Sequence, residues 1–278
     1  MLSISRYSIQ NSSLAPWIKF IWYLEAEKAD IHLKLLPTDS IDIIMNLSDE
    51  MIYETESRKI AARSFHVNGL RGGHSYIHQS GEIRVFGISF YSYGLFPFIN
   101  KSLKNVQNDI VDLYSISVPL AQKLKSATSK GTIQDIVESI EKVLCSEMNV
   151  NDGPISKAII IRNFIETDED TSIRCFCAEQ GVNVKTFERT VLRYTGYTPK
   201  VLRRIKRFQT ASNQLIRETP ADLAAIAYDN SFTDQSHFTK EFCKFSGATP
   251  RAFQQERIAS KKMFDNPVTE RFVKFVLR

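Results

Sequence analysis

The stretch Gly196-Tyr-Thr-Pro199-Lys200 recurs fifty-one positions later as Gly247-Ala-Thr-Pro250-Arg251, and each copy follows a helical pattern. The agreement continues upstream at the same offset, where apolar residues match apolar residues and cations match cations. The matched pairs are Phe187 and Phe238, Arg189 and Lys240, and Val191 and Phe242. Such self-similarity indicates one structural unit used twice. A duplicated helix with a cationic face indicates recognition of a polyanion at two points.

The first copy has the pattern of a helix-turn-helix unit. A short helix is predicted over 173–180, a turn at Gly181, and a second helix over 184–194. At 3.6 residues per turn, the apolar and cationic side chains of the second helix fall on opposite sides. The apolar set is Phe187, Val191 and Tyr194, and the cationic set is Lys185, Arg189 and Arg193. The apolar side would hold the helix, and the cationic side would meet the partner.

The second copy repeats this arrangement. A supporting helix carries Leu223, Ile226 and Ala227, a turn runs through 229–231, and a helix is predicted over 234–245 with Asp234 as N-cap. The inward positions of this last helix are Phe238, Phe242 and Phe245, and the outward ones are Gln235, Ser236, His237, Lys240 and Lys244. Cations neutralise phosphates, and Gln, Ser and His can hydrogen-bond to base edges in a major groove. The mixed surface favours sequence readout over charge alone.

One continuous helix is predicted between the copies, from residue 200 to 216. Its buried positions are Leu202, Ile205, Phe208, Ala211 and Leu215. A rigid helix fixes the separation of the two reading helices. Heads about 34 Å apart, one turn of DNA, can enter successive major grooves.

Residues 155–256 resemble the DNA-binding domain of the AraC/XylS family of bacterial transcription regulators. The residues that carry the resemblance are Ile226-Ala227, Phe232-Thr-Asp-Gln-Ser236, Phe238, Phe242 and Gly247-x-x-Pro250. The first copy matches more loosely, with Phe176-Cys177 in place of the usual Leu-Ala. Ser231 stands where a glycine usually precedes the phenylalanine.

The resemblance implies DNA contacts by Lys185, Glu188 and Arg189 in the first copy and by Gln235, Ser236, His237 and Lys240 in the second. The helical projection adds Arg193 and Lys244. Glu188 either repels phosphate or accepts from a cytosine amino group. His237 has three open readings: a base contact, a phosphate contact or neither.

The N-terminal part has the pattern of a small antiparallel β-domain. Short β-branched and aromatic runs at 18–24, 32–36, 41–45 and 83–90 are separated by turn formers at 37–40, 46–49, 72–73 and 79–82. The run Leu36-Pro-Thr-Asp-Ser-Ile-Asp-Ile-Ile-Met-Asn46 resembles the sensor domains of the same family, which are β-rich and often cupin-like. An apolar stripe from Ile133 to Leu144 predicts a helix that covers the sheet or forms a dimer seam, and coverage is favoured.

The expected fold class is therefore α+β. A β-rich, cupin-like sensor domain with covering helices spans 1–147, and turn formers at 146–154 mark the linker. An all-α domain with two helix-turn-helix units joined by a linker helix spans 155–257. The tail 258–278 carries a further amphipathic pattern without an assigned function.

Composition narrows the class of protein. The chain has 278 residues and a net charge of +5, divided as −1 before residue 150 (15 Lys/Arg, 16 Asp/Glu) and +6 after it (21 and 15). Nine cations and one acid lie between Lys185 and Arg217. No apolar run approaches the roughly 20 residues of a membrane span. Four scattered cysteines show neither zinc nor disulfide spacing. The expectation is a cytoplasmic protein without contact to a membrane.

Enzymatic chemistry finds little support in the sequence. The only catalysis-like constellation is His74-x-x-x-His78-x-x-x-Glu82, and its spacing differs from the His-x-His arrangement of cupin metal sites. Structural histidines are the favoured interpretation, with no metal and no cofactor expected. Arg71, the Gly72-Gly73 pair, Tyr91 and Tyr93 could line a pocket, although core or surface placement is the ordinary expectation.

The favoured hypothesis is a sequence-specific DNA-binding transcription regulator, an activator, controlled by a small-molecule effector in the N-terminal domain. Its expected partners are double-stranded promoter DNA, RNA polymerase, an effector and a second copy in a homodimer. One alternative is a ligand-independent regulator controlled by abundance or by a protein partner. The other is a metal-binding cupin-type enzyme fused to a DNA-binding domain.

Overall fold

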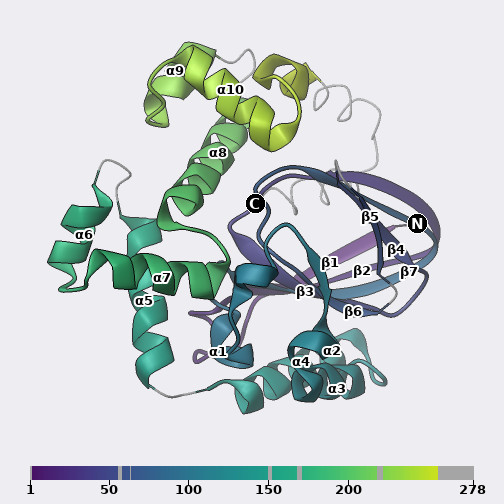
Figure 1. Cartoon of the computed structure of the whole chain (residues 1–278). Coiled ribbons are helices and arrows are strands. Elements are labelled where there is room, and N and C mark those ends of the chain that lie inside the picture. Colours follow the sequence, from purple (N-terminus) through teal and green to yellow (C-terminus); the bar gives the residue numbers. More distant parts are fainter. Residues whose placement is uncertain are drawn as a thin grey trace.

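The structure is a computed structural model that describes residues 2–55, 58–62, 64–149, 152–167, 171–217 and 222–255. A β-rich domain comes first along the chain, and a purely helical domain follows it (Figure 1). This order confirms the predicted α+β class. The predicted tail, residues 258–278, lies outside the described residues.

Among the described residues, eight antiparallel strands form one bent sheet in the β-rich domain. They are β1 (Ser3–Tyr7), β2 (Ile18–Leu35), β3 (Ser40–Asn46), β4 (Met51–Glu54), β5 (Lys59–Ala62), β6 (Phe65–Asn68), β7 (Ser75–Tyr91) and β8 (Ile110–Asp112). The strand order is β1-β2-β7-β3-β6-β8, and β4 joins β5 to β7. Strand β7 pairs with β2 along nearly its full length, while its other edge pairs with β4 and then with β3. Two long strands thus form the centre of the sheet.

Two sequence-based predictions about these strands were wrong. The runs at 18–24 and 32–36 belong to one strand, β2, and the predicted turn at 79–82 lies inside β7. Gly81 adopts a φ of +102°, and the register shifts at the same level, where β2 carries one extra residue between Ala26 and Ala29. A β-bulge inserts turn-like residues without ending a strand, so the local pattern resembles a break.

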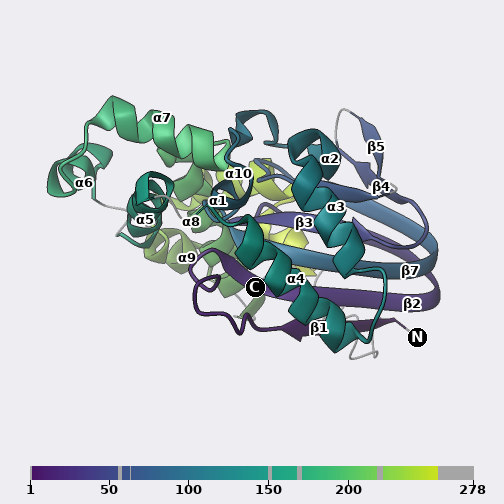
Figure 2. The same cartoon turned by 90° about the horizontal axis from the view of Figure 1, so that it is seen from below.

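Short helices cover this domain: α1 (Phe96–Ile99), the 3₁₀ helix η1 (Leu103–Asn105), α2 (Leu113–Ile116), α3 (Val118–Ala127) and α4 (Ile133–Glu147). Helix α4 starts with a reciprocal capping box between Thr132 and Asp135. Its apolar stripe, including Ile136, Ile140 and Leu144, is buried in the main hydrophobic core. Figure 2 shows α4 lying along the domain beside α3. Coverage, the favoured expectation for the stripe, is therefore observed within one chain.

The helical domain consists of α5 (Asp152–Glu166), α6 (Ile173–Glu179), α7 (Val184–Thr195), α8 (Pro199–Arg217), α9 (Leu223–Asp229) and α10 (Gln235–Ser246), followed by helical residues 250–255. The predicted helices at 173–180, 184–194, 200–216 and 234–245 each agree within about one residue at either end. Helix α8 joins two helix-turn-helix units, which lie at its opposite ends (Figure 1). No helix within the described ranges is long and apolar enough to cross a bilayer.

Candidate DNA interface and ligand cavity

Helix α7 is amphipathic and carries the predicted contacts of the first unit. Asn183 caps it by accepting a hydrogen bond from the Thr186 amide at 3.2 Å. The inward residues Phe187, Val191 and Tyr194 are buried, as predicted. Lys185, Glu188 and Arg189 are exposed on the outer face, where a polyanion can reach them.

Arg193 occupies a different position from the other cations of α7. Its guanidinium lies 5.1 Å from the centre of the Phe96 ring, which belongs to α1 of the β-rich domain. The side chain is exposed but lies at the junction between the domains. A DNA contact by Arg193 would therefore be made from the edge of the interface.

Helix α10 carries the corresponding surface in the second unit. Asp234 caps it by accepting from the His237 amide at 2.7 Å. Its buried side carries Phe238, Phe242 and Phe245. The predicted contact residues on the other side are exposed at four positions, Gln235, Ser236, Lys240 and Lys244.

His237 is half-buried and makes local contacts. Its Nδ1 accepts from the Thr233 amide at 3.3 Å, and its ring meets the Phe232 ring edge-on at 5.6 Å between centres. With Nδ1 as an acceptor, the neutral ring keeps Nε2 as a donor. His237 can present that donor at the start of the reading helix.

Four cations of the basic stripe hold the domain together. Arg203 and Lys206 donate to the carbonyls of Thr171 and Ile165, beside the first unit. Two more reach the second unit: Arg204 forms a two-pronged ion pair with Glu241 at 2.7 and 2.8 Å, and Arg207 donates to the carbonyl of Ser231. The linker helix thus fixes both units through its own cations, and charge counting alone would have assigned these residues to DNA.

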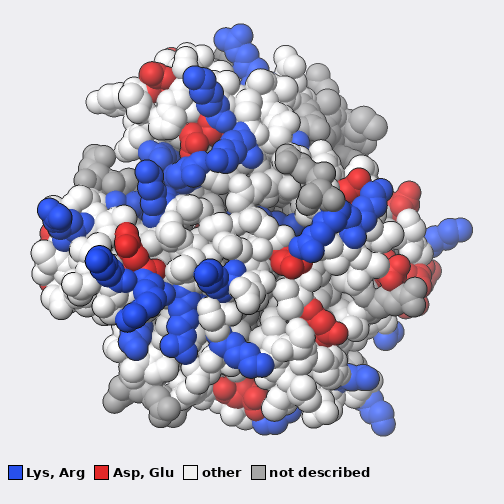
Figure 3. Space-filling view, viewed as in Figure 1, with Lys and Arg blue, Asp and Glu red and all other residues white. Residues whose placement is uncertain are grey.

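Lys and Arg side chains are visible over the helical domain, and others lie over the β-rich domain on the same face (Figure 3). In Figure 3, Lys and Arg side chains gather over the region that α7, α8 and α10 occupy in Figure 1. Helix α8 has 19 residues and at 1.5 Å per residue spans about 28 Å. This length is close to one turn of B-DNA, roughly 34 Å. The arrangement suits two helices that enter neighbouring major grooves.

Both units also contact the β-rich domain. Tyr194 of α7 stacks on Phe96 with 3.8 Å between ring centres, and the Tyr197 hydroxyl donates to Asn108 Oδ1 at 2.7 Å. Gly247, which ends α10 in a left-handed conformation, packs against the His74 ring. A cleft lined from both domains runs between these contacts. The β-rich domain is therefore in direct contact with both helix-turn-helix units.

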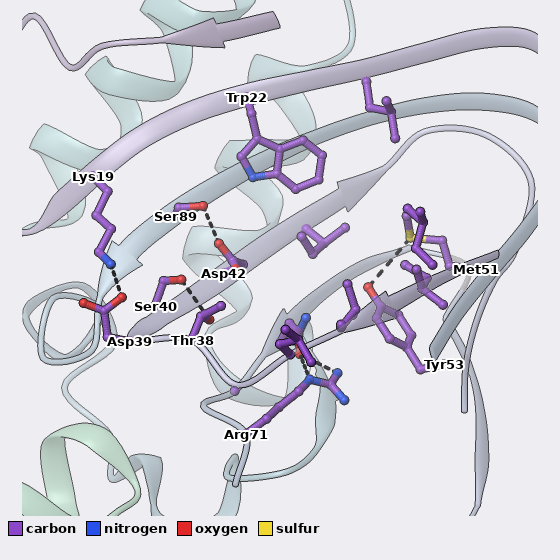
Figure 4. Close-up of a pocket in the computed structure, with 18 of the residues that line it drawn as sticks. Lys19, Trp22, Thr38, Asp39, Ser40, Asp42, Met51, Tyr53, Arg71 and Ser89 are labelled. Atoms are coloured by element: carbon purple, nitrogen blue, oxygen red, sulfur yellow. Dashed lines mark hydrogen bonds and ion pairs between the residues drawn. The ribbon is translucent and has the colours of Figure 1, made fainter. Parts of the chain in front are cut away.

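The β-rich domain contains a cavity of about 120 Å³. A single water molecule needs roughly 10–15 Å³ of such space, so a small organic molecule fits. Its wall is largely apolar, and the residues of that part are Phe20, Trp22, Leu24, Ile31, Leu33, Leu35, Leu36, Ile44, Met51 and Ile77. Figure 4 shows Trp22 and Asp42 on one side of the cavity and Arg71 and Tyr53 on another.

Polar groups complete the wall. Lys19 and Asp39 form an ion pair, and Gln209 of α8 lies 3.5 Å from Asp39, so the DNA-binding domain reaches the cavity. Asp42 accepts a hydrogen bond from Ser89, and burial raises the pKa of its carboxyl to about 6, although Ser89 and the nearby cations act in the opposite direction.

The histidine constellation predicted as the one metal candidate is dispersed. His74 lies against Gly247, whereas His78 stacks on His32 at 3.9 Å and lies 3.3 Å from Glu54. Glu82 lies opposite the bulge of β2, and its amide donates to Asp49. Within the described part of the chain no group of three His, Cys, Asp or Glu side chains is placed to hold a metal ion.

Comparison with protein families decides the class of the helical domain. A helix-turn-helix family model, of the AraC type, matches residues 176–256, which include both reading helices. Residues 176–256 are therefore an AraC-type helix-turn-helix domain, and this match supports a DNA-binding regulator. A second model, a domain of unknown function (DUF6597), matches residues 11–112 of the β-rich domain. No curated protein matches the chain.

Solved structures similar to this chain include ToxT from Vibrio cholerae O395, at 13% identity and a TM-score of 0.43, over 93% of this chain and 96% of ToxT. ToxT of strain SCE256 with a bound unsaturated fatty acid has 13% identity and a TM-score of 0.44, over 91% and 94%. The AraC-like transcriptional activator CuxR has 13% identity and a TM-score of 0.27, over 75% and 86%.

Several residues that line the cavity were missed at the sequence level, among them Trp22, Asp42, Tyr53 and Ser89. One signal was present: in β3 the alternation Ser40-Ile-Asp42-Ile places a carboxylate on the face opposite Ile41 and Ile43. Arg71 was weighed as a pocket residue and set aside, yet it lines the cavity. Its partners come from distant strands, which no local pattern shows.

Proposed function

We propose that this regulator reads DNA with α7 and α10 and is controlled by a small molecule bound in the β-rich domain. The carrying observation is the pair of helix-turn-helix units at the ends of α8, each with an exposed polar and cationic face. Lys185, Arg189, Lys240 and Lys244 supply salt-dependent affinity. Glu188, Gln235, Ser236 and His237 contribute to base discrimination, and Arg193 contacts the backbone from the edge.

The cavity supports control by an effector. It combines an apolar wall with a few polar groups, the usual composition of a small-molecule site. Gln209 brings α8 to its edge, so that occupancy can alter how the reading domain is held. An effector must bind the active and inactive arrangements unequally to change transcription.

The site of action proposed is a promoter in the cytoplasm, where the regulator activates transcription together with RNA polymerase. Family resemblance supports activation. A single chain already carries two reading helices, and the stripe of α4 is buried within the chain. One chain is therefore enough to contact two blocks of a binding site. A homodimer would form through a surface other than the apolar stripe of α4.

Selection of binding sites from random duplex DNA with the full-length protein tests the reading function. We expect enrichment of two sequence blocks about one helical turn apart. Lys240→Ala should weaken binding to the selected site, whereas Lys125→Ala, an equal charge change on α3, should leave it unchanged. Binding governed by salt alone, without an enriched sequence, would contradict sequence readout.

A further inference from the structure

A buried cation in the cavity wall has no carboxylate partner among the residues that the structure describes. Arg71 is 7% exposed and donates to two neutral acceptors, Asn68 Oδ1 (from Nε at 3.0 Å and from Nη2 at 2.6 Å) and Ser75 Oγ (from Nη1 at 2.6 Å). A guanidinium has five N–H groups, so two remain without a partner among the described residues. Nor does any carboxylate of the described residues lie within ion-pair distance of it. Burial lowers the pKa of the guanidinium, although the more distant Asp42 and Asp109 act in the opposite direction. The guanidinium also lies 5.6 Å from the centre of the Tyr53 ring.

The carboxylates that line the same cavity are already engaged elsewhere. Asp39 is paired with Lys19, and Asp42 is bonded to Ser89. Buried charges in proteins are normally paired, because desolvation without a partner is costly. Arg71 lines both the cavity and the cleft between the domains. A ligand anion in the cavity would supply the missing partner.

We propose that the cavity takes an organic anion with an apolar body, whose charged group pairs with Arg71, and that this pairing acts on both helix-turn-helix units through residues 71–74. The inference rests on the proposed function, since it assumes that the cavity is the effector site. It adds the chemical class of the effector and the route by which its binding reaches the reading helices.

The route to the first unit is a shared hydrogen-bond acceptor. The Gly72 amide donates to Asn108 Oδ1 at 2.7 Å, and the same oxygen accepts from the Tyr197 hydroxyl at 2.7 Å. Tyr197 lies between α7 and α8. A side chain at position 72 would stand 3.0 Å from the Tyr197 hydroxyl, so glycine permits this approach. Movement of Arg71 therefore changes the position of an atom bonded to the first unit.

The route to the second unit is a packing contact. Gly247 ends α10, and a Cβ at this position would overlap the ring of His74. His74 is three residues from Arg71, and the residues between them are Gly72 and Gly73. One four-residue segment thus contacts the cavity and both repeats.

Pairing of Arg71 with a ligand changes the conformation of residues 71–74, because the planar guanidinium group moves as one rigid unit. An anion that engages the free N–H groups pulls the fork toward the cavity and competes with Asn68 and Ser75. Gly72 and Gly73 let the backbone at residues 72–74 rotate with the displaced side chain. The two helix-turn-helix units then shift relative to the sheet. The protein binds the ligand with different affinity before and after this shift.

Titration calorimetry on the full-length protein tests the ligand class, with decanoate and 4-phenylbutanoate as probes and decanamide and decylamine as uncharged and cationic counterparts. We expect decanoate to bind roughly 10- to 100-fold more tightly than decanamide. Arg71→Gln should remove this preference. The matched control is Arg58→Gln, because Arg58 pairs with Asp109 and lines the outer cleft but not the cavity, and this variant should keep the preference.

Two outcomes of this titration would overturn the inference. One is equal decanoate affinity in wild type and Arg71→Gln. The other is tighter binding of decylamine than of decanoate, which would make Asp42 the anchor. If Arg71→Gln fails to unfold cooperatively on heating, Arg71→Lys replaces it: the retained charge should keep a preference for decanoate over decanamide, and loss of all preference in that variant counts against the inference.

Fluorescence anisotropy with the selected DNA tests the route. We expect decanoate to change the DNA affinity of the wild type by roughly 5- to 150-fold. Tyr197→Phe should bind decanoate normally but respond less. Tyr194→Phe is the control, because its hydroxyl donates to the Pro154 carbonyl within the helical domain, and it should respond as wild type does. An undiminished response in Tyr197→Phe would refute the route.

A further measurement separates a failure of the proposed function from a failure of the effector proposal. It compares the affinity of the ligand-free wild type for the selected DNA with its affinity for scrambled DNA. Selective binding without any carboxylate binding would leave the regulator standing and remove the anionic effector. Loss of selectivity would remove the reading function itself, whatever binds in the cavity.

Discussion

The two helix-turn-helix units have nearly the same hydrogen bonds and the same terminating glycine at the end of the second helix. At the end of the reading helix, Thr195 in the first unit and Ser246 in the second donate to the carbonyl four residues before and accept from the amide two residues after. A glycine with positive φ, Gly196 or Gly247, then ends the helix. These devices follow from residue types, and both copies carry them.

The units differ in how they dock on the β-rich domain. The first is held by the Tyr194–Phe96 stack and by the bond from Tyr197 to Asn108. The second touches that domain at Gly247 and His74. The turns also differ, because four residues separate α6 from α7 and five separate α9 from α10. The comparison shows that both copies keep the same internal structure. The contacts with the β-rich domain decide how tightly each copy is held against it.

The largest expected effects concern the buried phenylalanines that the copies share. Phe187→Ala and Phe238→Ala each remove a ring that is at most 3% exposed, and each should lower the free energy of unfolding by about 3–5 kcal/mol. Urea denaturation measures both. A much smaller loss in one copy would show that the two cores are not packed alike.

Substitution of the terminal glycines should distinguish the docking of the copies. Gly196→Ala and Gly247→Ala both place a Cβ at positive φ, which costs about 1–2 kcal/mol. At position 196 the Cβ also stands 2.8 Å from the backbone carbonyl of Leu103, whereas at 247 it meets a side chain, His74, that can rotate. We expect the larger loss of unfolding free energy for Gly196→Ala.

The double variant His74→Ala with Gly247→Ala provides the control. Removal of the ring should leave only the backbone cost of Gly247→Ala. Equal losses for the two single glycine variants would contradict the difference in docking.

Alanine substitutions on the reading helices test whether both copies read DNA. Arg189→Ala and Lys240→Ala should each weaken binding to the selected site by about 1–3 kcal/mol, and a residue that contacts a base edge should also change base preference at its position. Competition binding at fixed salt measures both quantities. Full affinity and unchanged preference in both variants would remove these helices from the interface.

The smallest expected effect lies in the turns. Ser231 has a φ of +54°, a conformation that disfavours a side chain, and Gly181 holds the equivalent place in the first copy at +63°. Ser231→Gly should raise the free energy of unfolding by about 1 kcal/mol or less, because relief of strain is partly offset by the entropy of the unfolded chain. Gly181→Ser is the mirror test and should lower it, although space around residue 181 is open. A stabilising Gly181→Ser would show that φ does not control these turns.

Much of the helical domain was predictable from the sequence because its determinants are local. Caps, helix period and turn glycines act within a few residues, and the predicted helices lie within about one residue of α6, α7, α8 and α10. The β-rich domain was predicted less well. Strands β2 and β7 each contain turn-like residues, and only pairing with each other makes them continuous.

The candidate DNA contacts were also placed on exposed faces by periodicity, apart from the half-buried His237. The structural role of the cations on the linker helix α8 was not predicted. Arg203, Arg204, Lys206 and Arg207 hold carbonyls and a carboxylate up to 41 residues away, which a charge count cannot reveal.

The sequence by itself determined the duplicated reading unit and its class, because short-range patterns encode helices, caps and amphipathic faces. Tertiary structure alone decided the cavity, the position of Arg71 in its wall beside neutral acceptors, and the contacts of residues 72–74 with both units. These features join residues far apart in the chain, such as Gly72 with Tyr197 and His74 with Gly247. Long-range packing has no local period, so it becomes visible only when the chain is folded.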